Sequence, residues 1–112
     1  MAMKVSFDLT DKVVIVTGAG SGIGKTIAEV CADQGADLAL GSRTVSRCEE
    51  TASTCRELGR RAKAWELDLT DIASIRAFVE KTLDTFGRID VLVNKAGRTR
   101  DATLLKMTEE QW

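Results

Sequence analysis

The sequence contains no histidine and only three cysteines, Cys31, Cys48 and Cys55. An odd number of cysteines without C-x-x-C spacing, in a chain without histidine, predicts neither a disulfide framework nor a zinc site. Cys48 and Cys55 lie on one face of a predicted helix, where two helical turns separate them by about 10 Å, too far for a bridge. We therefore expect no metal centre, and we expect all three cysteines to lie in the core.

The sequence also lacks a strong net charge and a long apolar run. Its formal charge is -1, with acidic and basic residues interspersed, so no basic surface for nucleic acid or an anionic membrane is expected. No apolar stretch approaches membrane-spanning length, and the opening MAMKVSFDLTDK is too polar for a signal peptide. At 44% hydrophobic and 29% charged residues, the chain suits one domain over residues 1–112. A cytoplasmic location is expected.

Strand-like and helix-like segments alternate along the chain, which is typical of parallel strand–helix–strand units. The predicted strands are Val13 to Val16, Asp37 to Gly41, Ala62 to Glu66 and Val91 to Asn94. The predicted helices are Gly22 to Gln34, Val45 to Leu58, and a third that is capped by Thr70 and closed by Gly87. Their apolar faces are expected to carry Ile23, Ile27, Val30 and Cys31 in the first, Val45, Cys48, Ala52, Cys55 and Leu58 in the second, and Ile72, Ile75, Val79, Leu83 and Phe86 in the third.

This alternation predicts an α/β fold with a doubly wound parallel sheet of strand order 3-2-1-4, truncated after the fourth strand, with its ligand at the carboxyl ends of the strands. Right-handed crossovers place the first two helices on one face of the sheet and the third alone on the other. Val91 to Asn94 would then be an unpaired edge, although its apolar side chains suit a buried strand. We expect a homo-oligomer to cover this surface, or a longer chain to fill it.

Residues Val13 to Gly24, VVIVTGAGSGIG, carry the clearest functional signal, because an apolar strand runs into a glycine-rich turn and then into a helix. Glycines let a ligand approach the main chain, and the first turn of the helix offers unpaired N–H groups at the positive end of its dipole. This arrangement predicts phosphate binding, and a nucleotide is the usual ligand. The candidate residues of this turn are Gly18, Ser21, Gly22, Ile23 and Gly24.

A second interpretation of the turn is a Walker-type NTPase. The segment AGSGIGKT, Ala19 to Thr26, differs at one residue from the pattern G-x-x-x-x-G-K-S/T. Lys25 would then hold the β and γ phosphates, Thr26 would bind Mg²⁺ and Asp68 would be a further metal ligand. Ala19 is a poor substitute for a glycine in a phosphate cradle, which favours the dinucleotide interpretation.

Ser42 and Arg43 follow the second predicted strand, where an acidic residue would select NAD(H) through the adenosine ribose. A serine does not repel a 2′-phosphate, and a guanidinium can pair with one in a fork, so these residues favour NADP(H) over NAD(H). On the alternative interpretation, Arg43 is an exposed loop arginine. Asp37 begins the same strand, roughly 13 Å from its ligand end at about 3.3 Å per residue, and is expected to be structural.

Two further segments follow strands: Asp68 and Leu69 lie in LDLTD, and Asn94 to Gly97 reads NKAG. Together with the T-G-x-x-x-G-x-G turn of Thr17 to Gly24, they resemble the short-chain dehydrogenase/reductase family, in order and separation, over essentially the whole chain. The resemblance implies a Rossmann-type fold. It also implies roles for residues outside the glycine turn: Asp68 accepts a hydrogen bond from the adenine amino group, the Leu69 backbone meets the adenine ring, Asn94 braces the sheet, and Ala96 and Gly97 let the backbone approach the nicotinamide-side ribose.

The sequence departs from the family pattern at two positions. Lys95 replaces the second asparagine of the family's N-N-A-G segment, and Arg98 stands where an aliphatic residue is usual. These two cations either alter cofactor binding or face solvent.

Within the family, RIDVLVNKAG and the tail TRDATLLKMTEEQW look most like the 3-oxoacyl-[acyl-carrier-protein] reductases. The resemblance implies reduction of a carbonyl to an alcohol by NADP(H), on a small-molecule substrate such as an acyl-carrier-protein or CoA thioester. The family's catalytic serine, tyrosine and lysine follow the fourth strand, and this sequence contains no tyrosine. We therefore assign no catalytic residue and expect these residues alone to be inactive, because a general acid is missing. The alternative is a non-catalytic nucleotide-binding fragment or module.

Overall fold

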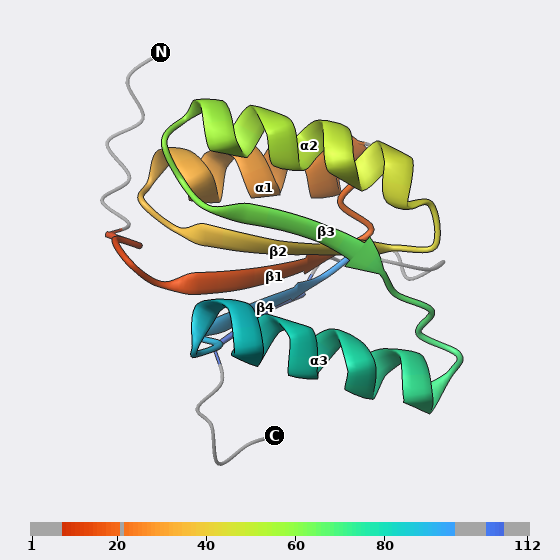
Figure 1. Cartoon of the computed structure of the whole chain (residues 1–112). Helices are drawn as coiled ribbons and strands as arrows, with labels where there is room; N and C mark the ends of the chain where they lie inside the picture. The colour runs from red at the N-terminus through yellow and green to blue at the C-terminus, as the bar shows by residue number, and fades with distance from the viewer. Residues whose placement is uncertain (1–7, 21, 96–102, 107–112) are drawn as a thin grey trace.

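The chain forms one five-stranded sheet with helices on both faces (Figure 1). The structure, a computed structural model, describes residues 8–20, 22–95 and 103–106. The strands are β1 (Val13–Thr17), β2 (Asp37–Ser42), β3 (Ala62–Glu66), β4 (Val91–Asn94) and β5 (Thr103–Lys106), and the helices are α1 (Gly22–Asp33), α2 (Val45–Glu57) and α3 (Ile72–Phe86). The first four strands are parallel and lie in the order β3-β2-β1-β4, which confirms the predicted fold class and order.

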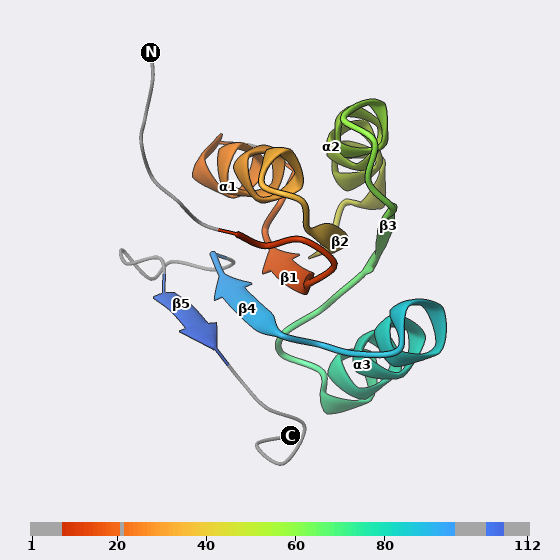
Figure 2. The same cartoon turned by 90° about the vertical axis from the view of Figure 1, so that its left-hand side faces the viewer.

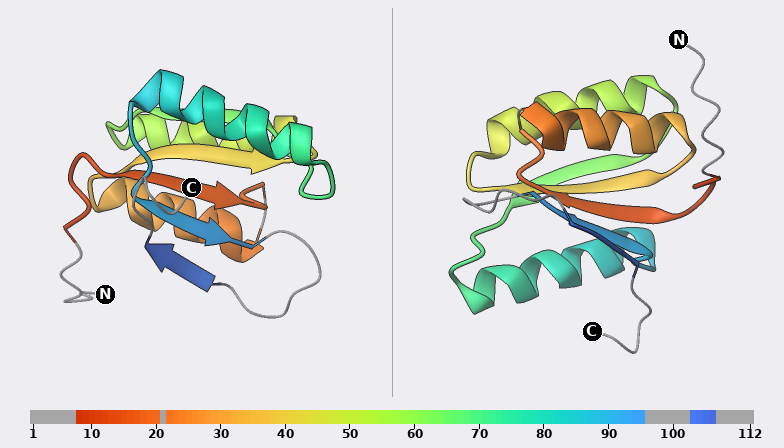
Figure 3. Two further views of the ribbon diagram at one scale, coloured as in Figure 1. Left: turned by 90° about the horizontal axis from the view of Figure 1, so that it is seen from below. Right: turned by 180° about the vertical axis from the view of Figure 1, so that it is seen from behind.

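The prediction that the fourth strand is an unpaired edge is wrong. β5 pairs with β4 in antiparallel register, with Val91 opposite Lys106 and Asn94 opposite Thr103. Figure 2 shows β5 beside β4 at the edge of the sheet, and in Figure 3 the two arrows run in opposite directions. The backbone groups of β4 that would otherwise be exposed are therefore used by the chain itself, which is one way in which proteins protect a sheet edge.

The two faces of the sheet bury separate cores. α1 and α2 cover one face and α3 covers the other (Figure 1), as the right-handed crossovers predicted. Because side chains alternate along a strand, β1 contributes Val14 and Val16 to the core under α1 and α2, and Val13 and Ile15 to the core under α3. β1 is thus the central strand of the sheet and is buried on both faces.

The predicted apolar face of α1 is partly wrong. The residues that α1 buries are Gly24, Ala28 and Ala32, whereas Ile23 is 60% and Val30 is 53% exposed. The predicted Ile27 and Cys31 do pack against the core from its margin. Small side chains let the helix axis approach the sheet closely. The residues of α1 that face the sheet are therefore the small ones and not the most hydrophobic ones.

The expected faces of α2 and α3 need smaller corrections. α2 buries Cys48, Ala52 and Cys55 as predicted, together with Thr51, but Val45 and Leu58 at its ends are exposed. α3 buries Phe78, Thr82 and Phe86, whereas Ile72 and Leu83 are exposed.

The predicted N-cap of α3 is off by one residue. The cap is Asp71, whose carboxylate accepts a hydrogen bond from the Ala73 N–H at 3.0 Å. Thr70 instead bonds to Asp68. Gly87 ends the helix as predicted, in the left-handed conformation at φ 83°.

The three cysteines are free thiols. Cys48 and Cys55 are buried and Cys31 is partly buried. Burial raises the pKa of the Cys31 and Cys55 thiols to about 11. Within the described ranges, no group of three or more histidine, cysteine or acidic side chains is placed to hold a metal ion. No described helix is long and apolar enough to span a membrane.

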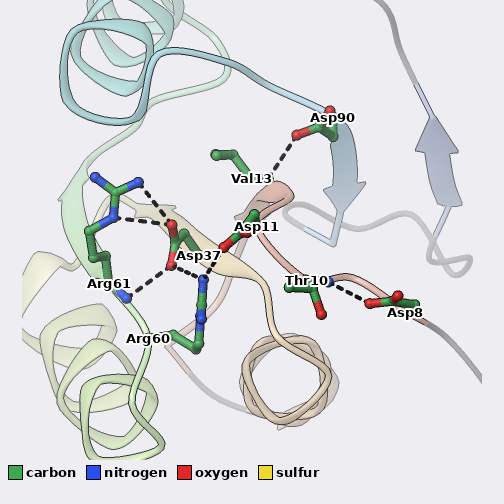
Figure 4. Close-up of polar contacts among 8 residues, drawn as sticks. All are labelled: Asp8, Thr10, Asp11, Val13, Asp37, Arg60, Arg61 and Asp90. Atoms are coloured by element: carbon green, nitrogen blue, oxygen red, sulfur yellow. Dashed lines mark hydrogen bonds and ion pairs between the residues drawn. The ribbon is translucent and has the colours of Figure 1, made fainter.

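The amino-terminal edge of the sheet is closed by an ion-pair cluster around Asp37 (Figure 4). Asp37 begins β2 and is 4% exposed. The Arg61 guanidinium donates to its carboxylate from Nε at 3.1 Å and from Nη2 at 2.9 Å, and Arg60 Nη2 lies 3.1 Å from the other oxygen. Asp37 is therefore a structural residue at the edge opposite the glycine turn, as predicted.

Candidate functional site

A cleft of about 620 Å³ opens at the carboxyl edge of the parallel strands. Four segments of the chain form it: the glycine turn after β1 and the residues that end or follow β2, β3 and β4. Its described lining residues are Thr17, Gly18, Gly22, Ile23, Gly24, Gly41, Ser42, Arg43, Thr44, Leu67, Asp68, Leu69, Thr70 and Lys95. The strand order β3-β2-β1-β4 brings these segments side by side, which is where a doubly wound sheet binds its ligand.

Most of the candidate residues meet in this cleft. The structure places Gly18, Gly22, Ile23, Gly24, Ser42, Arg43, Asp68 and Leu69 in its lining. Asn94 lies instead in an adjoining apolar pocket of about 120 Å³, which Thr17 also lines. Ser21, Ala96 and Gly97 lie outside the described residues, as does Arg98.

Five further residues of the lining were not predicted from the sequence: Thr17, Gly41, Thr44, Leu67 and Thr70. Each of them ends a strand or follows one closely. Their position at or after the ends of strands could have predicted this placement, because the carboxyl ends of parallel strands converge on one edge of the sheet.

The glycine turn is built for close approach of a ligand to the main chain. Gly18 and Gly22 adopt left-handed φ angles of 67° and 60°. A Cβ at Gly24 would lie 2.2 Å from the Gly18 carbonyl oxygen, so α1 starts directly against the turn. A Cβ at Gly22 would meet nothing within 4 Å, so the space beside it is open to the cleft. The turn thus fits a phosphate group at the start of α1.

Two hydrogen bonds hold the turn in place from neighbouring elements. The Gly18 N–H donates to the Gly41 carbonyl of β2 at 2.8 Å. The buried Thr51 hydroxyl of α2 donates to the Ala19 carbonyl at 2.9 Å. Because both anchors belong to packed elements, the backbone of the turn is preorganised.

On the β4 side, the Thr17 hydroxyl connects two strands. It lies 2.9 Å from Asn94 Oδ1, to which it donates, and it accepts a hydrogen bond from the Lys95 N–H at 2.9 Å. The ends of β1 and β4 are therefore joined at the point where the strand order reverses. This contact uses Asn94 to brace the sheet and fixes the backbone of Lys95 at the wall of the cleft.

On the β3 side, Asp68 is the acidic residue of the described lining. Its carboxylate accepts hydrogen bonds from the Thr70 hydroxyl at 2.6 Å and the Thr70 N–H at 2.9 Å. These bonds, with the nearby positive charge of Arg43, hold the pKa of Asp68 below its usual value. The cleft therefore offers a charged acceptor next to the exposed guanidinium of Arg43.

The placement of Lys25 and Thr26 disfavours the Walker-type interpretation. Both are exposed and neither belongs to the described lining of the cleft. The Thr26 hydroxyl donates to the Gly22 carbonyl within α1 at 3.3 Å, as an ordinary helical threonine does.

The parallel sheet, the glycine turn and the cleft at the carboxyl edge define a nucleotide-binding domain of the Rossmann type. The family profile described as short chain dehydrogenase matches residues 12–112. The chain therefore belongs to the short-chain dehydrogenase family and contains its nucleotide-binding region. Membership of this oxidoreductase family implies a nicotinamide cofactor.

The similarity extends to curated relatives and to solved structures. The chain is 43% identical over 101 residues to the 3-oxoacyl-[acyl-carrier-protein] reductase FabG of Escherichia coli, over 90% of this chain and 40% of that protein. It is 40% identical over 104 residues to the enzyme of the same name from Thermotoga maritima, over 93% and 42%. The crystal structure of an NAD⁺-bound xylitol dehydrogenase matches with a TM-score of 0.79 and 33% identity, over 82% of this chain and 35% of that one. The chain thus spans about two fifths of the length of these curated relatives.

Proposed function

We propose that this chain binds NADP(H) in preference to NAD(H), as the cofactor-binding part of a short-chain reductase. The end of β2 carries this proposal, because Ser42 and the exposed Arg43 line the cleft there. A carboxylate at this place would accept hydrogen bonds from the ribose hydroxyls of NAD(H). Ser42 brings no charge, and its Oγ already accepts a hydrogen bond from the Thr44 N–H at 2.9 Å. The Arg43 guanidinium suits a 2′-phosphate, to which it donates two parallel N–H bonds.

The remaining cleft residues have roles along the length of the dinucleotide. The proposed contacts are the pyrophosphate with Gly18, Ser21, Gly22, Ile23 and Gly24, the adenosine ribose with Ser42 and Arg43, the adenine with Asp68 and Leu69, and the nicotinamide-side ribose with Asn94, Ala96 and Gly97. The open space beside Gly22 supports the pyrophosphate position. When bound, the nicotinamide supplies the hydride for carbonyl reduction.

The proposed substrate is a 3-oxoacyl thioester on acyl-carrier protein or CoA, which is reduced to the 3-hydroxy product. The names of the two curated relatives support it. The 112 residues contain neither tyrosine nor histidine to protonate the developing alkoxide, so they should bind cofactor without turning over substrate. Carbonyl-dependent oxidation of NADPH by a preparation of verified mass would contradict this expectation.

Calorimetric titration with NADPH and NADH tests the cofactor choice. The protein should bind NADPH more tightly, and Arg43→Ala should reduce that preference by roughly 10- to 100-fold, the value of a hydrogen bond to a charged group. Arg76→Ala is the matched control, because Arg76 is an exposed arginine of α3 outside the cleft lining. Equal affinities for the two cofactors, unchanged by Arg43→Ala, would overturn the assignment.

We further propose that residues 1–112 belong to a single domain that self-associates. The sheet face under α3 keeps an apolar pocket beside Leu92 and Ile75, which association over this face would cover. Light scattering should give a multiple of the 12.2 kDa chain mass, and a stable monomer would contradict the proposal.

A further inference from the structure

Lys95 places a positive charge at the β4 end of the cleft. The charged residues of the described lining are Arg43, Asp68 and Lys95. The sheet order puts Asp68 and Arg43 together on the β3 and β2 side, whereas Lys95 lies across β1 from them. Among the described residues no carboxylate forms an ion pair with Lys95, and Asp68, the acidic residue of the described lining, lies on the far side of β1.

The position of Lys95 is fixed by the fold. Its N–H donates to the Thr17 hydroxyl, which in turn donates to Asn94, so the backbone at Lys95 is tied to the end of β1. Neighbouring strands lie about 4.8 Å apart, which places this backbone roughly one strand spacing from the glycine turn and two from Arg43. The backbone at Lys95 is therefore nearer to the glycine turn than to Arg43, and it lies across β1 from the 2′-phosphate position.

This inference rests on the proposed function, which indicates which half of the dinucleotide lies near Lys95. The pyrophosphate lies at the start of α1 and the adenosine on the β2 and β3 side, so the other nucleoside must cross the switch point to the β4 side. In the oxidised cofactor that nucleoside carries a positively charged nicotinamide ring, and in the reduced cofactor the ring is neutral. An uncompensated ammonium group at this place repels the first and tolerates the second.

We propose that Lys95 is a specificity-determining residue for the redox state of the cofactor, which makes the cleft bind the reduced dinucleotide more tightly than the oxidised one. When the two forms compete at equal concentrations, a site of this kind is occupied mainly by the reduced form. Asparagine, which the family pattern has at this position, carries no charge and would not make this distinction.

The test is a pair of dissociation constants, for NADPH and for NADP⁺, measured by calorimetry on the purified protein. Lys95→Asn should tighten NADP⁺ relative to NADPH by roughly 3- to 10-fold, the size of a screened interaction between two unit charges at a cleft wall. Lys95→Arg should keep the wild-type ratio. Lys25→Asn is the matched control, because Lys25 is an exposed lysine of α1 outside the described lining.

Three results would overturn the inference. An equal weakening of both forms in Lys95→Asn would make Lys95 a phosphate contact, and unchanged dissociation constants for both forms would make it a solvated side chain. A folded wild-type protein that binds no nicotinamide dinucleotide would remove the proposed function and this inference together. If the protein prefers NAD(H), only the assignment of Arg43 fails, and the NADH to NAD⁺ ratio then tests Lys95 in the same way.

Discussion

The Thr17 hydroxyl lies 2.9 Å from the side-chain oxygen of Asn94 and joins the carboxyl ends of β1 and β4. The two residues are 77 positions apart in the sequence, so the contact exists only in the folded chain. Thr17 is 3% exposed, and its hydroxyl also accepts a hydrogen bond from the Lys95 N–H. One buried side chain therefore links the ends of the two strands that flank the switch point.

Thr17→Val should lower the free energy of unfolding by about 1 to 3 kcal/mol. The substitution keeps the shape but leaves the Lys95 N–H without its acceptor and Asn94 Oδ1 without its donor. Thr26→Val is the control, because the Thr26 hydroxyl is exposed on α1 and its loss should cost less than about 0.5 kcal/mol. Urea denaturation of both variants measures the difference, and equal costs would show that the contact contributes nothing.

How far the sequence predicts this protein depends on whether the determining contact is local. The strand order and the glycine turn could be predicted because apolar strands and helix-ending glycines recur along the chain. The residues that α1 buries could not be predicted in this way. Hydrophobicity favours Ile23 over Ala28 as a buried residue, whereas close packing of the helix on the sheet selects the smaller Ala28. Thr70 and Asp71 are both good helix caps, and the contact of Thr70 with Asp68 decides between them.

The same distinction holds for the cleft and for the sheet edge. Ser42, Arg43 and Asp68 follow strands, so the pattern of parallel strands is enough to predict that they lie together. The link between Thr17 and Asn94 spans most of the chain and leaves no local signal. β5 reads TLLK, which shows neither alternation nor the longer apolar run that marks β4, a strand of the same length.

Gly22→Val and Lys25→Ala distinguish the dinucleotide and Walker-type interpretations. Gly22→Val should abolish nucleotide binding, because the side chain would project into the open space of the turn and its left-handed φ disfavours a β-branched residue. Lys25→Ala should leave binding unchanged, since the exposed Lys25 is outside the described lining. Calorimetry with NADPH and with Mg-ATP checks both. Loss of binding in Lys25→Ala, with Gly22→Val unaffected, would reverse the ranking.

Gly24→Ala should destabilise the fold more strongly than Gly59→Ala. At Gly24 the added Cβ would lie 2.2 Å from a backbone oxygen, so α1 must move away from the turn. We expect a cost of about 2 to 3 kcal/mol, the upper part of the usual range for overpacking, because the backbone oxygen cannot yield. Gly59 has a left-handed φ of 91° but nothing within 4 Å of the added Cβ, so only about 1 to 2 kcal/mol of backbone strain applies. Thermal unfolding in the absence of cofactor compares the two, and equal midpoints would contradict the packing argument.

Asp90→Asn should reduce stability in a pH-dependent manner. Burial alone would raise the pKa of Asp90, but hydrogen bonds from the Arg88 side chain and the Val13 N–H outweigh it, and the pKa lies below its ordinary value of 3.8. The carboxylate contact is therefore fully present above about pH 4 and is lost as the pH falls through the lower value of the folded state. We expect Asp90→Asn to cost about 0.5 to 1.5 kcal/mol at pH 7, a modest figure because Arg88 is half exposed and screened by solvent.

The difference in unfolding free energy between wild type and Asp90→Asn should then narrow between pH 5 and pH 3, as urea titrations at several pH values can show. Asp84→Asn serves as the control, because Asp84 is an exposed residue of α3 whose replacement should change stability by less than about 0.5 kcal/mol. A difference that stays constant from pH 7 to pH 3 would mean that the charge of Asp90 is not what stabilises the start of β1. In that case the hydrogen bond from the Val13 N–H, 2.9 Å long with Asp90, would supply the stabilisation, because an asparagine oxygen can still accept it.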